Sequence, residues 1–235
     1  MNEMRMSEDI YVDELWMNFI ENNFSYVKAL FPRIYVDVNR HPLELDQKMF
    51  SSLMPSLNFK DNSKVNLGSG VIPRLSVYGN EIYNTLLTRT NIRKRLLDHY
   101  FPYHKILKRY VKEAKTVHKE ILIFDCHSMP SRGLFDKDID IVMGTNYSKA
   151  ISKKLFTSIK DVFLNEKFKV AVNTPYSGGY ISKYYGNLKN KINVLQIEIN
   201  RKKYMNEKLW SRNIFKMKDV SLRFESIIYK VNEMF

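Results

Sequence analysis

The strongest hydrophobic pattern in the chain is at residues 121–124, where four apolar side chains follow one another and two of them are β-branched Ile. A short run of this kind is typical of a buried strand. Pro130 cannot continue a central strand, so the strand should end before it. Because side chains alternate between the two faces of a strand, Asp125 and His127 are predicted to share one face, with Cys126 on the other.

The spacing of apolar residues elsewhere predicts further elements. Helical spacing predicts helices at residues 7–30, 84–115, 149–165 and 218–235, with Ser7 as the first N-cap and an interruption near Pro102. Shorter β-type runs predict strands at residues 34–38, 138–143, 169–172 and 193–199. Segments rich in turn-forming residues predict loops at residues 51–80 and 174–180. Since strands alternate with helices, we expect an α/β fold with a largely parallel sheet, as one domain over residues 1–235.

The predicted strand at residues 193–199 alternates between apolar and polar side chains. The apolar side chains should face one side of the sheet, and they are Leu195, Ile197 and Ile199. The polar side chains should face the other side, and they are Gln196, Glu198 and Asn200. Burying an unpaired carboxylate costs on the order of several kcal/mol. Glu198 should therefore be paired, be associated with a metal, or act as a general base with a tuned pKa. A salt bridge to an arginine at the rim of the sheet is the purely structural alternative.

Two other residues that follow predicted strands are candidates for chemistry. His127 is placed to bind a metal or a substrate, although a lone histidine is more often only hydrogen-bonded. Arg40, next to Asn39, carries a guanidinium that matches a carboxylate with two parallel hydrogen bonds. The alternative for Arg40 is a turn, because residues 39–42 have good turn chemistry. Cys126 is excluded as a nucleophile activated by its neighbour, since adjacent strand residues point to opposite faces.

Composition narrows the class of protein. The chain has 235 residues, 44% of them hydrophobic and 27% charged, which suits one sizeable globular domain. No run is long and apolar enough to span a bilayer, and the first ten residues lack the apolar core of a signal peptide. Cys126 is the single cysteine, so an internal disulfide is excluded. We therefore expect a cytoplasmic protein.

The net charge of +13 has two interpretations. Basic surfaces favour nucleic-acid phosphates, so a nucleic-acid binder is one of them. The other is a lysine-rich composition spread over solvated faces. The chain carries no recognised nucleic-acid motif, and its basic residues are scattered and mixed with acidic ones, which favours the second interpretation.

Eight segments of the chain resemble the N-formylglutamate amidohydrolase family, and they occur in the family's order. They are residues 8–15 (EDIYVDEL), 32–42 (PRIYVDVNRHP), 70–74 (GVIPR), 100–104 (YFPYH), 125–130 (DCHSMP), 140–144 (DIVMG), 175–180 (PYSGGY) and 196–201 (QIEINR). Each segment alone is a weak signal. Together they cover nearly the whole chain in register, which makes the match specific.

The resemblance implies a three-layer α/β fold of the zinc carboxypeptidase and aspartoacylase type, with a mostly parallel or mixed sheet flanked by helices. It implies hydrolysis of the amide bond of an N-formyl or N-acyl amino acid such as N-formyl-L-glutamate, with one catalytic Zn²⁺ per chain. His127 and Asp9 would be metal ligands, and Glu198 the general base that takes a proton from the activated water. The residues that would bind the substrate are Asn39, Arg40, Arg74, Tyr176, Gly179 and Tyr180.

One departure from the family concerns the metal. Family members begin with a strand and a Pro-His-Ser-Gly-like loop that supplies the first zinc-binding histidine, and this sequence begins after that point. The chain is therefore expected either to be truncated at its start or to have lost that ligand. His104 is expected to be structural, or to support the residues that hold the metal, and not to replace the missing ligand.

Two functions from different classes follow. The first is a zinc-dependent amidohydrolase whose partner is a small-molecule N-acyl amino acid, with no nucleic acid and no membrane involved. The alternative is a catalytically impaired relative that acts as a ligand-binding module. The sequence does not fix the acyl group, the amino-acid part or the oligomeric state.

Overall fold

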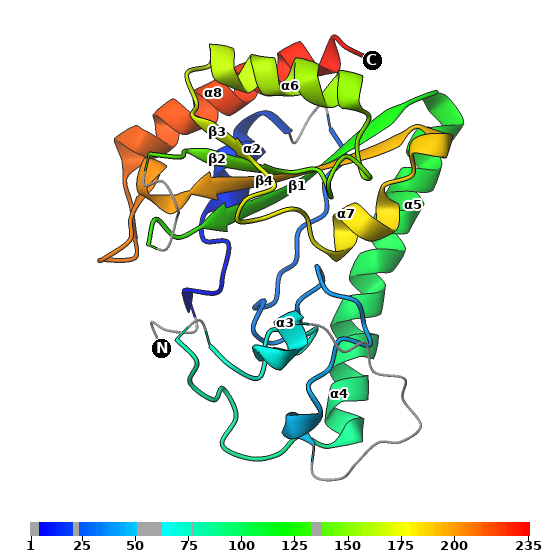
Figure 1. Ribbon diagram of the computed structural model, residues 1–235, viewed down its shortest axis with the longest axis vertical. Helices are drawn as coiled ribbons and strands as arrows, with labels where there is room; N and C mark the ends of the chain where they lie inside the picture. Colours follow the sequence, from blue (N-terminus) through cyan, green and yellow to red (C-terminus); the bar gives the residue numbers. More distant parts are fainter. Residues whose placement is uncertain (1–4, 21–23, 51–62, 77, 133–137) are drawn as a thin grey trace. The chain divides into compact units, whose positions relative to one another are not determined.

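The computed structural model describes residues 5–20, 24–50, 63–76, 78–132 and 138–235 (Figure 1). The chain forms two compact units. The first unit consists of Met1–Glu8 and Val27–Lys112, and the second consists of Asp9–Tyr26 and Glu113–Phe235. Each unit is described here by itself.

The second unit is built on a four-stranded sheet with the strand order β1-β4-β2-β3. The strands are β1 (Ile121–Met129), β2 (Ile141–Gly144), β3 (Val170–Val172) and β4 (Ile192–Asn200). β1 pairs with β4 in parallel, and β2 pairs with β3 in parallel. Because β2 and β4 run antiparallel, the sheet is mixed, and β1 is one of its two end strands.

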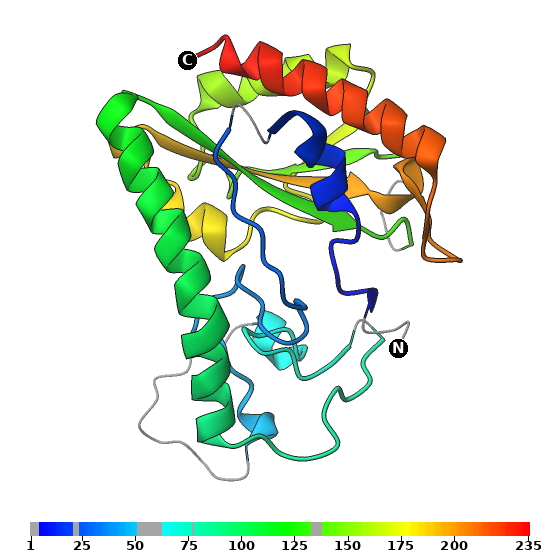
Figure 2. The ribbon, with the colours of Figure 1, turned by 180° about the vertical axis from the view of Figure 1, so that it is seen from behind.

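Helices cover both faces of this sheet. Helices α2 (Val12–Ile20), α6 (Lys153–Asn165) and α8 (Ile214–Asn232) pack on one face, and α7 (Tyr180–Tyr185) lies against the other (Figures 1 and 2). The smaller elements of this unit are η3 (Leu188–Asn190), η4 (Arg201–Lys203), β5 (Met205–Asn206) and β6 (Ser211–Arg212). We call the side of the sheet that carries α7 the α7 face.

The main core of the second unit lies between the sheet and helices α2, α6 and α8. The apolar side chains of β4, Leu195, Ile197 and Ile199, belong to it, as the alternating sequence predicted. Trp16 of α2 stacks on Phe224 of α8, with ring centroids 4.2 Å apart. Burial of such apolar area contributes about 25 cal/mol per Å². Since β4 is fixed by these contacts, its alternate polar side chains must project onto the α7 face.

The first unit consists mainly of turns and short helices. Its elements are η1 (Gln47–Met49), α3 (Ser63–Asn66), α4 (Arg89–Arg95), η2 (Leu96–Tyr100) and α5 (Phe101–Val117), whose end from Glu113 belongs to the second unit. The segment η2 is a π-helical turn immediately before Pro102. Proline lacks the N–H that a regular helix needs at this point, and a wider turn lets the helix continue. The predicted interruption is therefore a π turn inside one helical run.

The predicted helix at residues 7–30 is wrong at both ends. Among the described residues of this segment, 7–20 and 24–30, the helix covers only α2, and Ser7 is not its N-cap. Tyr11 has a left-handed backbone with φ of 61°, and the N–H of Val12 donates to the C=O of Asp9. This turn interrupts helical geometry before Val12, which a pattern of apolar spacing does not reveal.

The predicted strand at residues 34–38 is also wrong, because these residues form turns. The N–H of Tyr35 donates to the C=O of Pro32 at 2.9 Å. The Nε of Arg33 donates to Oδ2 of Asp37 at 3.0 Å, which ties the segment to itself four residues apart. Local hydrogen bonds therefore replace the strand pairing that the alternating apolar pattern predicted.

The other predicted strands and helices have the correct type but shifted ends. Strands at residues 138–143, 169–172 and 193–199 correspond to β2, β3 and β4. The helix at residues 149–165 begins at Lys153, after the N-cap Ser152, and the final helix begins at Ile214, after the N-cap Asn213. Of the predicted loop at residues 51–80, positions 51–62 and 77 lie outside the described residues, and α3 falls in the remainder.

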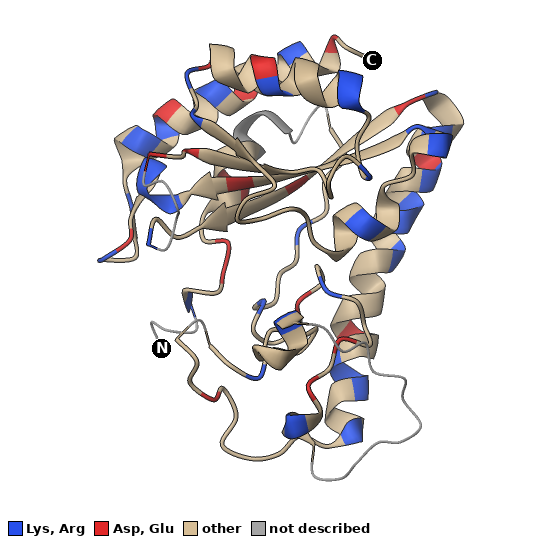
Figure 3. Ribbon diagram, viewed as in Figure 1, with Lys and Arg blue, Asp and Glu red and all other residues tan. Residues whose placement is uncertain are grey.

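Charge is distributed over many elements. Lysine and arginine residues occur along α5, α6 and α8, with acidic residues among them on each helix (Figure 3). This distribution is the one expected when basic residues occupy solvated helix faces. Within the described parts of the chain, no helix is long and apolar enough to cross a membrane.

Candidate active site

His127 lies on β1 between two carboxylates of the second unit. Its Nε2 is 2.9 Å from Oδ1 of Asp125, and its Nδ1 is 2.8 Å from Oδ2 of Asp9. The alternation of β1 thus places Asp125 and His127 on one face, as predicted, while Cys126 packs against the main core. Burial lowers the pKa of the His127 imidazole, but the charges of Asp125 and Asp9 raise it more, so this pKa lies well above its usual value.

Asp9 reaches His127 from the turn that precedes α2. Its second oxygen, Oδ1, accepts hydrogen bonds from the N–H of Ser128 at 2.7 Å and from the hydroxyl of Ser128 at 3.3 Å. The Nε of Arg201 in turn donates to the Ser128 hydroxyl at 3.1 Å. Since β1 is an end strand, Asp9 uses the backbone edge that no neighbouring strand occupies. Both carboxylate oxygens are therefore fixed by β1.

Glu198 lies on β4 beside His127. The two residues are partners in the parallel register of β1 and β4, so their side chains share the α7 face. Glu198 is buried, and its Oε1 accepts a hydrogen bond from Nε2 of Gln196 at 2.8 Å. A buried carboxylate next to an imidazole and a carboxamide is able to accept a proton from a water molecule bound at this face.

The loop before α7 is held against the same face. The N–H of Gly179 donates to Oε1 of Gln196 at 2.7 Å, and the N–H of Asn146 donates to the C=O of Ser177 at 2.6 Å. Gly144 of β2 makes room for the loop, because a Cβ at Gly144 would lie 2.8 Å from the N of Gly178. The absence of a side chain at Gly144 thus sets how closely the loop approaches the sheet.

The two predicted tyrosines of this loop have different surroundings. Tyr176 packs beside Met129 and Val142 on the α7 face. Tyr180 begins α7, and its ring stacks on Tyr184 with centroids 5.1 Å apart. Of the three predicted loop residues, Gly179 therefore contacts a polar group of β4, Tyr176 packs against β1 and β2, and Tyr180 packs within α7.

The other predicted substrate residues belong to the first unit, where Asp37 organises two of them. Its Oδ1 accepts from the N–H of Asn39 at 2.9 Å, and its Oδ2 lies 3.6 Å from Nε of Arg40. Burial raises the pKa of Asp37, but the neighbouring Arg33 and Arg40 lower it more, so this pKa is below its usual value. Arg40 also donates from Nη2 to the hydroxyl of Ser69 at 3.1 Å. The guanidinium of Arg40 is therefore held in one orientation.

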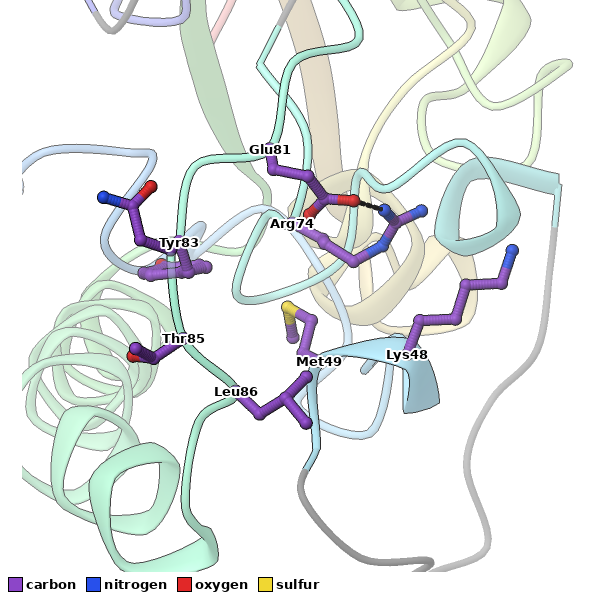
Figure 4. A pocket seen from close by; sticks show the side chains of 8 residues that line it. Lys48, Met49, Arg74, Glu81, Tyr83, Thr85 and Leu86 are labelled. Carbon is purple, nitrogen blue, oxygen red and sulfur yellow. Dashed lines mark hydrogen bonds and ion pairs between the residues drawn. The ribbon is translucent and has the colours of Figure 1, made fainter.

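Arg74 lies at a pocket of about 210 Å³ within the first unit (Figure 4). Its Nε donates to Oδ2 of Asp46 at 2.6 Å, and its Nη1 donates to Glu81. The lining residues are Lys48, Met49, Arg74, Glu81, Tyr83, Asn84, Thr85 and Leu86. In this conformation two carboxylates already bind Arg74, so a substrate carboxylate would have to compete with them.

His104 has the structural role that was expected of it. The side chain is buried in the first unit, and its Nε2 lies 2.9 Å from the C=O of Val38. The ring also packs against Tyr100, whose hydroxyl donates to the C=O of Arg40 at 2.8 Å. His104 and Tyr100 thus support the backbone of the turn that carries Arg40.

The contacts of three residues around His127 and Glu198 were not predicted from the sequence. They are the contact of Asp125 with His127, the hydrogen bond from Ser128 to Asp9, and the link from Gly179 to Glu198 through Gln196. Asp125 carried a usable signal, because a carboxylate two residues from a histidine on a strand shares its face. The same rule puts Gln196 on one face with Glu198, but the contacts of Gln196 with Gly179 and of Ser128 with Asp9 carried no signal, since these partners come from distant turns.

The donor atoms around His127 can be compared with the needs of a catalytic zinc. Such a site commonly has three protein ligands, drawn from His, Cys, Asp and Glu. Asp9 and His127 present one oxygen and one nitrogen side by side, and Asp125 holds the other imidazole nitrogen as outer-sphere carboxylates usually do. Over the described residues, no group of three or more such side chains is arranged so that it could hold a metal ion. The residues present therefore fit two of the three ligand positions.

Comparison with known proteins identifies the family of the chain. The sequence model of the N-formylglutamate amidohydrolase family matches residues 1–205. The chain belongs to this family. Among its curated family relatives, the N-formylglutamate deformylase of Pseudomonas aeruginosa is 24% identical over 205 residues, covering 85% of this chain and 71% of the relative. The N-formylglutamate deformylase of Pseudomonas putida is 26% identical, with the same coverage of both chains.

Solved structures show the same relationship. The chain is similar to the N-formylglutamate amidohydrolase of Ralstonia eutropha, with a TM-score of 0.87 and 26% identity over 97% of this chain and 84% of that one. A protein from Agrobacterium tumefaciens shares the fold alone, with a TM-score of 0.59 and 15% identity. The fold class predicted for the family, a mixed α/β sheet flanked by helices, is confirmed.

Proposed function

We propose that this member of the N-formylglutamate amidohydrolase family hydrolyses the amide bond of an N-formyl or N-acyl amino acid such as N-formyl-L-glutamate. The observation that carries the proposal is the group formed by His127 and Glu198, which are partners in the parallel pair of β1 and β4, and by Asp9, which contacts His127 from the turn before α2. The names of its relatives and its structural neighbour support the choice of substrate class.

Asp9 and His127 would hold a catalytic zinc ion through Oδ2 and Nδ1, with Asp125 orienting the imidazole from its other nitrogen. A bound zinc ion supplies a Lewis acid that acidifies water and polarises the amide carbonyl. Because catalytic sites usually have three protein ligands, one ligand besides Asp9 and His127 is needed.

Glu198 would act as the general base. It accepts a proton from water while the water oxygen forms a bond to the carbonyl carbon of the substrate. The carbon–nitrogen bond then breaks, and the same proton is delivered to the departing nitrogen. The products are a carboxylic acid, which is formate for a formyl substrate, and the free amino acid.

The residues of the first unit would recognise the amino-acid part of the substrate. Arg40 would bind the α-carboxylate, with Asn39 beside it, because Asp37 fixes the turn that presents both. Arg74 would bind a carboxylate in exchange for one of its two acidic partners. In the second unit, Tyr176, Gly179 and Tyr180 would contact the substrate from the loop before α7.

The experiment that tests the proposal measures glutamate release from N-formyl-L-glutamate by the wild-type chain and by Glu198→Gln. Turnover should fall at least about 100-fold in Glu198→Gln, because general-base catalysis typically contributes that much. The exposed Glu233→Gln is the matched control and should keep wild-type activity. Wild-type rates in Glu198→Gln would exclude this glutamate as the base.

A second candidate function is a ligand-binding module without turnover. The observation that favours it is that the described residues bring together two zinc-ligand side chains and no third. In that case the purified chain would bind N-formyl-L-glutamate in calorimetry, but would release no glutamate even with added zinc. Measurable release of glutamate would exclude the binding module and support the hydrolase.

A further inference from the structure

We propose that Gln196 is a positioning residue that couples the placement of the loop before α7 to the orientation of the base Glu198. The inference rests on the proposed function and extends it, because Gln196 would act through Glu198 and Gly179 without itself touching the reacting atoms. It is drawn from two hydrogen bonds that a single buried carboxamide makes in opposite directions.

The orientation of the Gln196 carboxamide is fixed by its partners. The backbone N–H of Gly179 can only donate, so the atom that faces it at 2.7 Å must be the carbonyl oxygen Oε1. The amino group Nε2 then faces Oε1 of Glu198, at 2.8 Å. An amide turned the other way would set two donors against each other at Gly179. Gln196 therefore presents a donor to Glu198 whenever the loop is in place.

Because of the position of Gln196, a change in its hydrogen bond with Gly179 should change its hydrogen bond with Glu198, and the reverse. Gln196 and Glu198 are two residues apart on β4 and share the α7 face, and both are buried. Gln196 pairs with Gly144 of β2, and the missing side chain of Gly144 is what lets Ser177 and Gly178 pass close by. A loop displaced from Gly144 would lose the Gly179 hydrogen bond and would leave a buried amide acceptor unsatisfied.

The two hydrogen bonds of Gln196 would contribute to different steps, one to substrate binding and one to the chemical step. The Gly179 end of the amide supports substrate binding, because Tyr176 and Tyr180 flank that contact in the loop. The Glu198 end supports the chemical step, because it holds the carboxylate that accepts the proton. One side chain thus makes a correctly placed base depend on a correctly placed binding loop.

Two substitutions distinguish these parts. Gln196→Glu keeps an acceptor for the Gly179 N–H but removes the neutral donor to Glu198. We expect kcat to fall at least about tenfold while KM stays within about twofold of wild type. Gln196→Leu keeps a similar side-chain volume but removes the hydrogen bonds to both Gly179 and Glu198, so kcat should fall and KM should rise. Thermal unfolding of each variant verifies that the loss is not a loss of folded protein.

A double-mutant cycle tests whether Gln196 acts through Glu198. In the Glu198→Gln background, Gln196→Glu should have almost no further effect on the residual turnover, because the group that it positions is already disabled. Asn193→Asp, another buried amide of β4 that contacts Glu120, is the control for a charge placed inside this strand. It should reduce stability without separating kcat from KM.

The outcomes separate this inference from the proposed function. Wild-type kcat and KM in both Gln196 variants, with Glu198→Gln inactive, would overturn the role of Gln196 and leave the hydrolase intact. Additive losses in the double mutant would overturn the coupling in the same way. An inactive wild-type chain would overturn both, since no reaction would remain for Gln196 to support.

Discussion

Oδ2 of Asp9 lies 2.8 Å from Nδ1 of His127, although the two residues are 118 positions apart in the chain. The contact depends on the left-handed turn at Tyr11, which ends the segment before α2 and points Asp9 at the edge of β1. The other imidazole nitrogen, Nε2, lies within hydrogen-bond distance of Asp125, so each nitrogen of His127 contacts a different carboxylate.

Asp125 should tune metal binding without being a ligand. Replacing it by asparagine keeps the shape but removes the charge behind His127, and we expect zinc affinity to fall about tenfold or more. Competition with a chromophoric chelator measures this affinity independently of turnover. The exposed Asp138→Asn is the matched control. Equal affinities in Asp125→Asn and the wild type would show that Nε2 of His127 needs no charged partner.

Arg40 should govern the affinity for substrates that carry an α-carboxylate. In Arg40→Ala we expect KM to rise roughly 10–100-fold, the loss typical of a charge-assisted hydrogen bond, with a smaller change in kcat. An N-formyl amine without the carboxylate serves as a comparison substrate, and its KM should not change. The exposed Arg89→Ala should behave as the wild type. An unchanged KM in Arg40→Ala would mean that Arg40 serves only the turn.

Asp37 should make the stability of the first unit depend on acid. Its pKa is lowered in the folded protein, so its stabilising effect is complete above the unfolded-state pKa and is lost as pH falls through the folded-state value. Near neutral pH, Asp37→Asn should lower the free energy of unfolding by about 1–3 kcal/mol, because it leaves Arg33 and Arg40 without their shared carboxylate.

Urea unfolding near pH 7 and near pH 3 tests this expectation for Asp37→Asn. The difference from wild type should shrink at the lower pH, because the carboxylate of unfolded wild-type Asp37 is then protonated and the free-energy gain from ionisation in the folded state is reduced. Asp98→Asn, an exposed position of the same unit, should show no such trend. If Asp37→Asn and wild type differed equally in free energy of unfolding at both pH values, the destabilisation would come from the changed shape of the side chain and not from its lost charge.

Gly144 should be intolerant of any side chain. A Cβ there would lie 2.8 Å from the N of Gly178 and 2.9 Å from the C of Ser177, and both are backbone atoms that cannot move alone. We expect Gly144→Ala to lower stability by about 1–3 kcal/mol and to lower kcat/KM for the proposed substrate. Differential scanning calorimetry and steady-state kinetics measure the two effects.

Gly79 provides the matched control for Gly144. A Cβ at Gly79 would meet no atom within 4 Å, although its φ of +84° makes a side chain strained. Gly79→Ala should therefore lower stability modestly and leave kcat/KM unchanged. If Gly144→Ala kept wild-type kinetics, the close approach of the loop to the sheet would have no bearing on activity.

The alternation of two strands was the part of the site that the sequence predicted well. Burial of Leu195, Ile197 and Ile199 against the helices forces Gln196 and Glu198 to the other face, and the same rule pairs Asp125 with His127. Such periodic constraints are local, so they can be followed from neighbouring residues alone.

The parts that could not be predicted depend on contacts between distant segments. The alternating residues 34–38 have the pattern of a strand, yet the N–H of Asp37 donates to the distant C=O of Val71 at 2.7 Å, and local bonds from Tyr35 to Pro32 and from Arg33 to Asp37 complete the turns. The direction of the Gln196 carboxamide is set by a loop seventeen positions earlier, which no local pattern encodes.

The bond from the Ser128 N–H to Asp9 has a consequence for association between chains. An end strand such as β1 offers unpaired backbone groups to which a strand of another molecule can add. Asp9 occupies one of these groups with a charged side chain, which opposes such pairing. We therefore expect the residue proposed to hold the metal also to oppose edge-to-edge pairing, so loss of Asp9 would impair solubility as well as chemistry.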